Sequence, residues 1–176
     1  MFALHPVPED LAPYVACIWT LDAPASAVPI APDGCCEWIV HLADAPLAAC
    51  GSGWRRQPRE FLFGQLAGPL VLHSDRAMRC LAVRFHPYAV TSLLRLSGSA
   101  LAPEELPLPA LGSCEAGSLP AVLRNVTIKL RSLVRDARPI DALAARTCRA
   151  LASPDDARIA ALAGIRPGAL SKTATR

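Results

Sequence analysis

The strongest constraint in this sequence is a change of pattern near residue 87. Before it, short runs rich in aromatic and β-branched residues are separated by Gly, Pro and Asp, which is typical of short antiparallel strands. Several short strands at this spacing favour a small β-barrel or sandwich. The predicted strands span residues 14–21, 35–42, 61–66, 70–73 and 78–85.

After this point the apolar residues follow the period of an α-helix. His86-Pro87 can open a first helix, which Gly98 can end. Two longer apolar stripes follow, and Arg138-Pro139 separates them, so we predict a helical hairpin. The first stripe contains Leu119, Val122, Leu123, Val126, Leu130, Leu133 and Val134, and the second contains Ile140, Leu143, Ala144, Thr147, Cys148 and Leu151. The chain is therefore predicted to be an α+β protein.

Composition excludes several broad classes. The chain has 176 residues, 52% of them hydrophobic and 19% charged, which is too apolar for a disordered protein. It has no run of about 20 apolar residues that could span a membrane, and its first residues lack the pattern of a signal peptide. We therefore expect a cytoplasmic protein that does not interact with membranes. The net charge of +3 does not by itself indicate nucleic-acid binding.

The sequence carries no recognisable catalytic or cofactor motif. It has no G-x-S-x-G, no P-loop and no G-x-G-x-x-G, so we expect neither an enzyme nor a bound cofactor. Its seven cysteines are an odd number without a C-x-x-C pair, which favours reduced thiols and no zinc site. Four side chains, His41, His73, Cys36 and Cys80, could converge inside a barrel. The interpretation we favour is that His41 ends a strand and that the cysteines are small core residues, without a metal.

Two predicted strands suggest a ligand pocket because both of their faces are largely apolar. Side chains alternate along a strand, so Cys36, Trp38 and Val40 share one face and Glu37, Ile39 and His41 the other. Such strands suit a small barrel, which is either filled or holds one ligand. Arg84 could bind a ligand carboxylate, or it could instead pair with Glu37 or cap a helix. The residues predicted to bind the ligand are Cys36, Trp38, His41, Cys80 and Arg84.

The first helical stripe has two interpretations. An amphipathic stripe normally packs against the chain's own core, but it can also bind the same helix of a second subunit. The second interpretation predicts a homodimer whose interface contains Leu123, Val126, Leu130, Leu133 and Val134.

The last residues have the outline of a helix-turn-helix. Ser153-Pro154-Asp155-Asp156 is a helix-start signal, Gly164 can end that helix, and Pro167 can begin another. The second helix of such a motif enters the major groove of DNA. The side chains predicted to contact DNA are Arg166, Lys172 and Arg176.

The order of these features resembles the N-terminal half of AraC-type transcriptional regulators. The matching segments are PEDLAPYVACIW, PDGCCEWIVHL, FGQLAGP and LAVRFHPYAVTSLL, and the resemblance covers roughly residues 5–165. It implies a small cupin-like antiparallel β-barrel that senses a small-molecule effector, followed by dimerising helices and a DNA-binding part. The implied division is 1–98 for the barrel, 99–152 for the dimerisation helices and 153–176 for a partial helix-turn-helix.

The final segment departs from the AraC pattern. Gly164 and Ile165 arrive early, Lys172 replaces the usual Arg, and Ala174 stands where the family has an anchoring Phe. The sequence given stops at Arg176, before a second motif, so we expect a truncated regulator with impaired DNA binding. Two alternatives stay open: a cupin-like small-molecule or metal-binding protein or enzyme, and a module that dimerises with a full-length relative.

Overall fold

The computed structural model describes residues 1–66, 68–95, 105–106 and 118–151. Contacts divide the chain into two compact units, Met1–Arg138 and Pro139–Arg176. Within the described ranges, no helix combines the length and the apolar character needed to cross a membrane.

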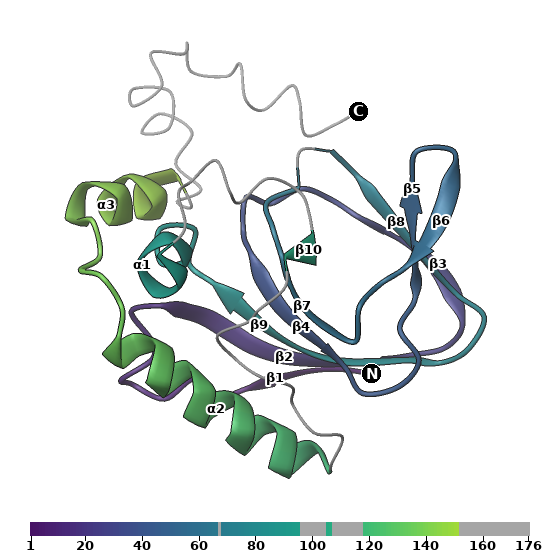
Figure 1. Cartoon of the computed structure of the whole chain (residues 1–176), viewed down its shortest axis with the longest axis horizontal. Helices are drawn as coiled ribbons and strands as arrows, with labels where there is room; N and C mark the ends of the chain where they lie inside the picture. The colour runs from purple at the N-terminus through teal and green to yellow at the C-terminus, as the bar shows by residue number, and fades with distance from the viewer. Residues whose placement is uncertain (67, 96–104, 107–117, 152–176) are drawn as a thin grey trace. The chain divides into compact units, whose positions relative to one another are not determined.

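The first unit contains two antiparallel sheets (Figure 1). The larger sheet has the strand order β1-β2-β9-β4-β7-β10, and the smaller one has the order β3-β8-β5-β6. The strands of the larger sheet are β1 (Phe2–His5), β2 (Val15–Ala23), β9 (Met78–Phe85), β4 (Glu37–His41), β7 (Glu60–Phe63) and β10 (Glu105–Leu106). Those of the smaller sheet are β3 (Ser26–Ile30), β8 (Leu70–Ser74), β5 (Leu47–Cys50) and β6 (Gly53–Arg56). The described strands thus form two separate sheets and not the closed barrel that the sequence suggested.

All five predicted strands are present, but the sequence analysis missed others. No strand was predicted between residues 42 and 61, although β5 and β6 form a hairpin there. Gly51 makes its tight turn possible, since it adopts a φ of 57° that most residues avoid. Every residue of β6 is exposed, so the strand shows no apolar alternation from which it could be recognised.

The central strand of the larger sheet, β9, is largely buried on both faces. One face, which we call the helix face, carries Ile18, Trp38 and Val83 in the hydrophobic core, and α2 (Leu119–Arg135) contributes to the same core. Figure 1 shows α2 running along this sheet, away from the smaller sheet. The short helix α1 (Val90–Leu94) adds two further core residues. Because α2 shares this core, it belongs to the same compact unit as the two sheets, Met1–Arg138.

The apolar stripe of α2 packs inside its own chain. Val126 and Leu130 are fully buried, Leu133 is 8% exposed, and Leu123 and Val134 are partly buried against the same core. These five side chains were predicted to form a dimer interface, but they pack in or against the core that α2 shares with the larger sheet. The structure supports the other interpretation of the stripe, which is core packing.

Polar contacts fix α2 to the helix face. The indole Nε1 of Trp38 donates a hydrogen bond to Oε1 of Glu60 at 3.1 Å, and the ammonium of Lys129 lies 4.0 Å from the same oxygen. That ammonium also lies 6.0 Å from the centre of the Trp38 ring, within range of a cation–π interaction. Two residues further along the helix, Arg131 makes two hydrogen bonds to Asp10, of 2.7 and 3.2 Å.

The described part of the second unit is α3 (Ala142–Leu151). Asp141 caps it, because its Oδ1 accepts hydrogen bonds from the amides of Leu143 and Ala144 at 2.8 and 3.0 Å. The helix confirms the second predicted stripe as helical. The predicted helix-turn-helix begins at Ser153 and lies outside the described residues, together with Arg166, Lys172 and Arg176.

Core packing of α2 predicts a large loss of stability on truncation of Leu130. The Leu130→Ala variant should lower the free energy of unfolding by about 3 kcal/mol, because it leaves a cavity in a packed core. Ile128→Ala is the matched control, since Ile128 lies on the same helix but is 59% exposed; it should cost less than about 1 kcal/mol. Urea denaturation at several protein concentrations measures both. A loss at Leu130 that depended on protein concentration would instead indicate a subunit interface.

Candidate functional site

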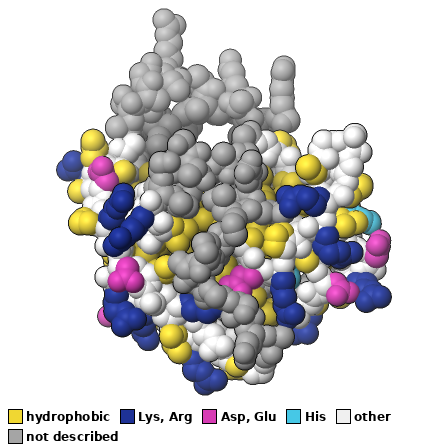
Figure 2. Space-filling view, viewed as in Figure 1, with side chains coloured by type: hydrophobic (Ala, Val, Ile, Leu, Met, Phe, Trp, Pro, Cys, Tyr) yellow, Lys and Arg dark blue, Asp and Glu magenta, His cyan; other side chains and the backbone are white. Residues whose placement is uncertain are grey.

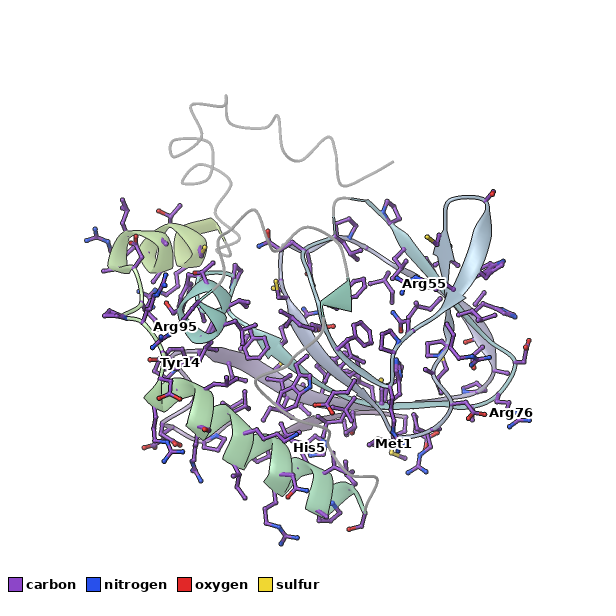
Figure 3. All side chains as sticks on the ribbon, in the orientation of Figure 1. Met1, His5, Tyr14, Arg55, Arg76 and Arg95 are labelled. Atoms are coloured by element: carbon purple, nitrogen blue, oxygen red, sulfur yellow. The ribbon has the colours of Figure 1, made fainter. Side chains whose placement is uncertain are left out.

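A cavity lies between the two sheets, on the face of the larger sheet opposite to α2. Its volume is about 190 Å³. We call it the inter-sheet cavity. Side chains from both sheets fill the space around it (Figure 3). The apolar lining residues are Trp19, Leu21, Ile30, Ile39, Pro46, Phe61, Phe63, Leu70, Leu72 and Met78, and the others are Glu37, His41, Gln57, Cys80 and Arg84.

The strand register explains why these side chains meet. Ile39 is paired with Ala82 of β9 and with Phe61 of β7, and His41 is paired with Cys80. Alternate residues of neighbouring strands point to the same face, so this row faces the smaller sheet. Leu72 of β8 belongs to the opposite wall.

The structure brings together three of the five predicted ligand-binding residues. His41, Cys80 and Arg84 line the inter-sheet cavity. Cys36 and Trp38 do not, because they point to the helix face and are completely buried in the core there. The predicted alternation along residues 35–42 was correct, but the residues chosen came from both faces.

Sequence reasoning missed several lining residues, and Glu37 is the most important of them. It lies two and four residues before Ile39 and His41 on the same strand, so the period of the strand was the signal that could have identified it. Gln57 and the aromatic residues Phe61 and Phe63 come from segments distant in sequence. Only the pairing of β4 with β7 reveals that Phe61 and Phe63 belong to the site.

The charged end of the cavity is a group of three paired side chains. Arg84 donates from Nε to Oε1 of Glu37 at 2.8 Å, and its second terminal nitrogen lies 2.9 Å from Oδ2 of Asp33. Trp19 donates a further hydrogen bond from Nε1 to Oε1 of Glu37 at 3.2 Å. Burial opposes the charge of Arg84, but the hydrogen bond that Arg84 donates to Glu37 and the charges of the two carboxylates outweigh it and raise the pKa of the guanidinium.

This arrangement combines two of the roles considered for Arg84. It lines the cavity and it is paired with Glu37, as the alternative interpretation proposed. Asp33 adds a second carboxylate from the turn before β4, where its Oδ1 also accepts a hydrogen bond from the amide of Cys35 at 2.9 Å. The guanidinium of Arg84 is therefore already paired with two carboxylates of the chain, so it is not a free binding site for the carboxylate of a ligand.

His41 is a buried neutral group at the other end of the site. Its side chain is 5% exposed, and its Nε2 lies 3.2 Å from Oε1 of Gln57. Burial lowers the pKa of His41 from 6.5 to about 4, and the hydrogen bond to Gln57 only partly opposes this. At neutral pH the imidazole is uncharged, so it contributes a hydrogen-bonding group to the cavity but no charge.

The buried thiols are suited to packing and not to chemistry. Burial raises the pKa of both Cys36 and Cys80 to about 11. A thiol with so high a pKa stays protonated at neutral pH, whereas thiolates are the nucleophiles and the metal ligands.

The four side chains considered as a metal set do not converge. Cys36 is on the helix face, and His73 forms a 3.0 Å pair with Asp75 beyond the end of β8. In the part of the chain that the structure describes, no three His, Cys, Asp or Glu side chains are arranged to hold a metal ion.

A second depression, of about 430 Å³, lies near the turn between β8 and β9. The polar side chains in it have partners within the chain: Arg76 pairs with Asp44 at 3.0 Å, His73 lies 3.0 Å from Asp75, and Arg56 donates a hydrogen bond to the carbonyl of Ala45 at 2.6 Å. Arg76 is labelled in Figure 3, and Figure 2 shows basic and acidic side chains interspersed over the face in view. The inter-sheet cavity, with apolar walls and few polar groups, is the better candidate for a ligand site.

The buried neutral His41 predicts a specific dependence of stability on pH. Its pKa is about 4 in the folded chain and about 6.5 when unfolded, so the unfolded state takes up the proton first as the pH falls. Relative to His41→Gln, the wild type should lose about 3 kcal/mol of unfolding free energy between pH 6.5 and pH 4. Urea denaturation across this range measures the difference. A difference between the two proteins that did not change with pH would show that His41 is not buried in its neutral form.

Several solved structures resemble parts of this chain. One is the Cupin_2 domain of an XRE family transcriptional regulator from Enterobacter cloacae, with a TM-score of 0.37 and 15% identity, over 49% of this chain and 97% of that one. An RmlC-like cupin protein from Desulfovibrio desulfuricans gives a TM-score of 0.36 and 14% identity, over 48% of this chain and 80% of that one. An HTH_3 family transcriptional regulator from Vibrio cholerae gives a TM-score of 0.38 and 13% identity, over 49% of this chain and 51% of that one. Similarities at this level do not assign a function.

The family is established by sequence. No curated protein matches the chain significantly. A family model described as a domain of unknown function, DUF6597, matches residues 4–107, which include the lining of the inter-sheet cavity and both sheets except the first two residues of β1. The chain therefore belongs to the DUF6597 family.

Proposed function

We propose that this chain is the ligand-sensing part of a cytoplasmic, AraC-like transcriptional regulator, and that the inter-sheet cavity of its cupin-like domain is the effector site. It acts as a non-enzymatic, dimeric binding protein whose role is regulation. The single observation that carries the proposal is the cavity itself, which is lined by apolar side chains from two sheets and by a few converging polar groups.

The walls of the cavity suit recognition better than catalysis. His41 is neutral, Cys80 stays protonated, and the carboxylate of Glu37 is hydrogen-bonded to Arg84 and Trp19. Groups held in this way orient a ligand, whereas a general base or a nucleophile needs a reactive protonation state near neutral pH. Binding energy between two sheets can then change how the sheets pack, which is what a sensor requires.

The regulatory half of the proposal comes from the sequence resemblance. The segments that resemble AraC-type regulators contain strand β4 and parts of β2 and β9, and they include Glu37, His41 and Arg84 of the cavity lining. The homodimer is part of the proposal, but its surface is not the apolar stripe of α2, which is buried.

A cavity-filling variant tests the effector site. The probe is phenethyl alcohol, a small neutral aromatic molecule. At about 100 times its dissociation constant it should raise the melting temperature of the wild type by roughly 5–10 °C. Leu72→Trp, which fills the cavity from β8, should abolish this shift. Val71→Trp is the matched control, because Val71 is the next residue on the same strand, does not line the cavity and is 36% exposed.

Two results would contradict the effector site. One is an unchanged melting temperature of the wild type at millimolar phenethyl alcohol. The other is an equal shift in Leu72→Trp and Val71→Trp, which would place the bound molecule elsewhere.

Binding to DNA is tested separately. The departures at Gly164, Lys172 and Ala174 predict that this chain binds DNA weakly and with little selectivity, with a dissociation constant of about 1 μM or weaker at physiological salt. Fluorescence anisotropy with promoter fragments and a scrambled fragment, at a stated salt concentration, measures both affinity and selectivity. Nanomolar binding that distinguishes the two sequences would overturn this prediction.

A further inference from the structure

The charges at the end of the inter-sheet cavity restrict what it can bind. Among the described residues that line the cavity, Arg84 is the single side chain with a permanent positive charge. It lies between two carboxylates, at 2.8 Å from Glu37 and 2.9 Å from Asp33. With both acids ionised, one positive and two negative charges leave this group with a net charge of −1.

We infer that the inter-sheet cavity selects small aromatic molecules that carry an amine, accepts neutral ones, and discriminates against aromatic carboxylates. This inference rests on the proposed function and names the ligand class of the same site. It also corrects the expectation that Arg84 would bind a ligand carboxylate.

A carboxylate in the cavity meets unfavourable electrostatics. It would have to displace Glu37 or Asp33 from the guanidinium, and the displaced acid would stay close to it. Two carboxylates that share one site repel each other. His41 cannot relieve this repulsion because it is uncharged at neutral pH.

An amine meets the opposite situation. Both hydrogen bonds that the structure gives to the carboxylate of Glu37 end on Oε1, one from Arg84 and one from Trp19. An ionised carboxylate accepts about four hydrogen bonds, so its Oε2 can receive an ammonium or an N–H donor of a ligand. Such a bond is charge-assisted and adds to the attraction of the net negative group.

The size and the walls of the cavity indicate an aromatic body for this ligand. About 190 Å³ is somewhat more than the volume at which an apolar protein cavity accepts one benzene ring, so one ring with a short side chain fits. The rings of Trp19, Phe61 and Phe63 line the site, and Phe61 and Phe63 pack edge to face. Aromatic faces attract aromatic rings and cations, but not anions.

Three probes of nearly equal size test the ligand class: phenethylamine, phenethyl alcohol and phenylacetate. Isothermal titration of the full chain at pH 7 measures their dissociation constants. We expect phenethylamine to bind most tightly, the alcohol to be intermediate, and phenylacetate to bind at least about tenfold more weakly than the amine.

A pair of charge variants links this order to the two carboxylates. Asp33→Asn with Glu37→Gln keeps the oxygen at position 37 that accepts from Arg84 and Trp19, and the oxygen at position 33 that accepts from the amide of Cys35. It gives up the contact of Asp33 Oδ2 with Arg84 and changes the net charge of the group from −1 to +1. Phenylacetate should then bind more tightly than phenethylamine. Asp33→Asn alone should reduce the preference for phenethylamine over phenylacetate. Because Asp33 lies on an exposed turn, this single variant provides the test if the double variant does not fold.

Asp10→Asn is the matched control for charge. Asp10 loses the same single charge but pairs with Arg131 of α2, on the helix face. This variant should keep the wild-type order of the three probes.

The outcomes separate the inference from the proposed function. Binding of all three probes with phenylacetate equal to or tighter than phenethylamine would overturn the ligand class and leave the cavity as a ligand site. If the double variant bound the three probes in the same order of affinity as the wild type, the ligand class would also be overturned, because the two carboxylates would then not determine the preference. No binding of any probe at millimolar concentration would overturn the proposed function together with the inference.

Discussion

The structure depends on one sheet that must be covered on both faces. Strands β4 and β9 carry apolar side chains toward both sides, with Trp38 and Val83 on one and Ile39 and Ala82 on the other. Leaving either face in water would forfeit the burial of several large side chains, at about 25 cal/mol for each Å² of apolar surface. The α2 helix covers one face, and the smaller sheet covers the other. The remaining features of the first unit follow from these two covers.

The two covers differ in how completely they pack. Against α2 the sheet forms a dense core in which Trp38, Val126 and Leu130 are fully buried. Against the smaller sheet it leaves the inter-sheet cavity, where polar side chains interrupt the apolar wall. A sheet held firmly on one face and less tightly packed on the other has a stable scaffold and a site that can respond to a ligand. The charged end of that site, Arg84 between Glu37 and Asp33, then determines which ligands are accepted.

The sequence allowed the local structure to be predicted better than the site. Alternation along residues 35–42 correctly grouped the side chains by face, and the period along residues 119–134 correctly identified the buried stripe of α2. Neither pattern contains information about what covers a face. For this reason Cys36 and Trp38 were predicted to bind the ligand, and the apolar stripe was considered as an interface with a second subunit. The contact of Arg84 with Asp33 bridges about 50 positions of sequence, and the exposed strand β6 has no apolar period, so only the folded chain reveals them.

The most direct test of the central claim is to observe where a small aromatic amine binds. Methyl NMR of the isoleucine-labelled chain, titrated with phenethylamine, distinguishes the surfaces, because Ile30 and Ile39 line the inter-sheet cavity while Ile18 lies in the core on the helix face and Ile128 is exposed on α2. The account predicts that the resonances of Ile30 and Ile39 shift and saturate together, and that those of Ile18 and Ile128 stay unchanged. Saturable shifts at Ile18 or Ile128, with Ile30 and Ile39 unaffected, would contradict it.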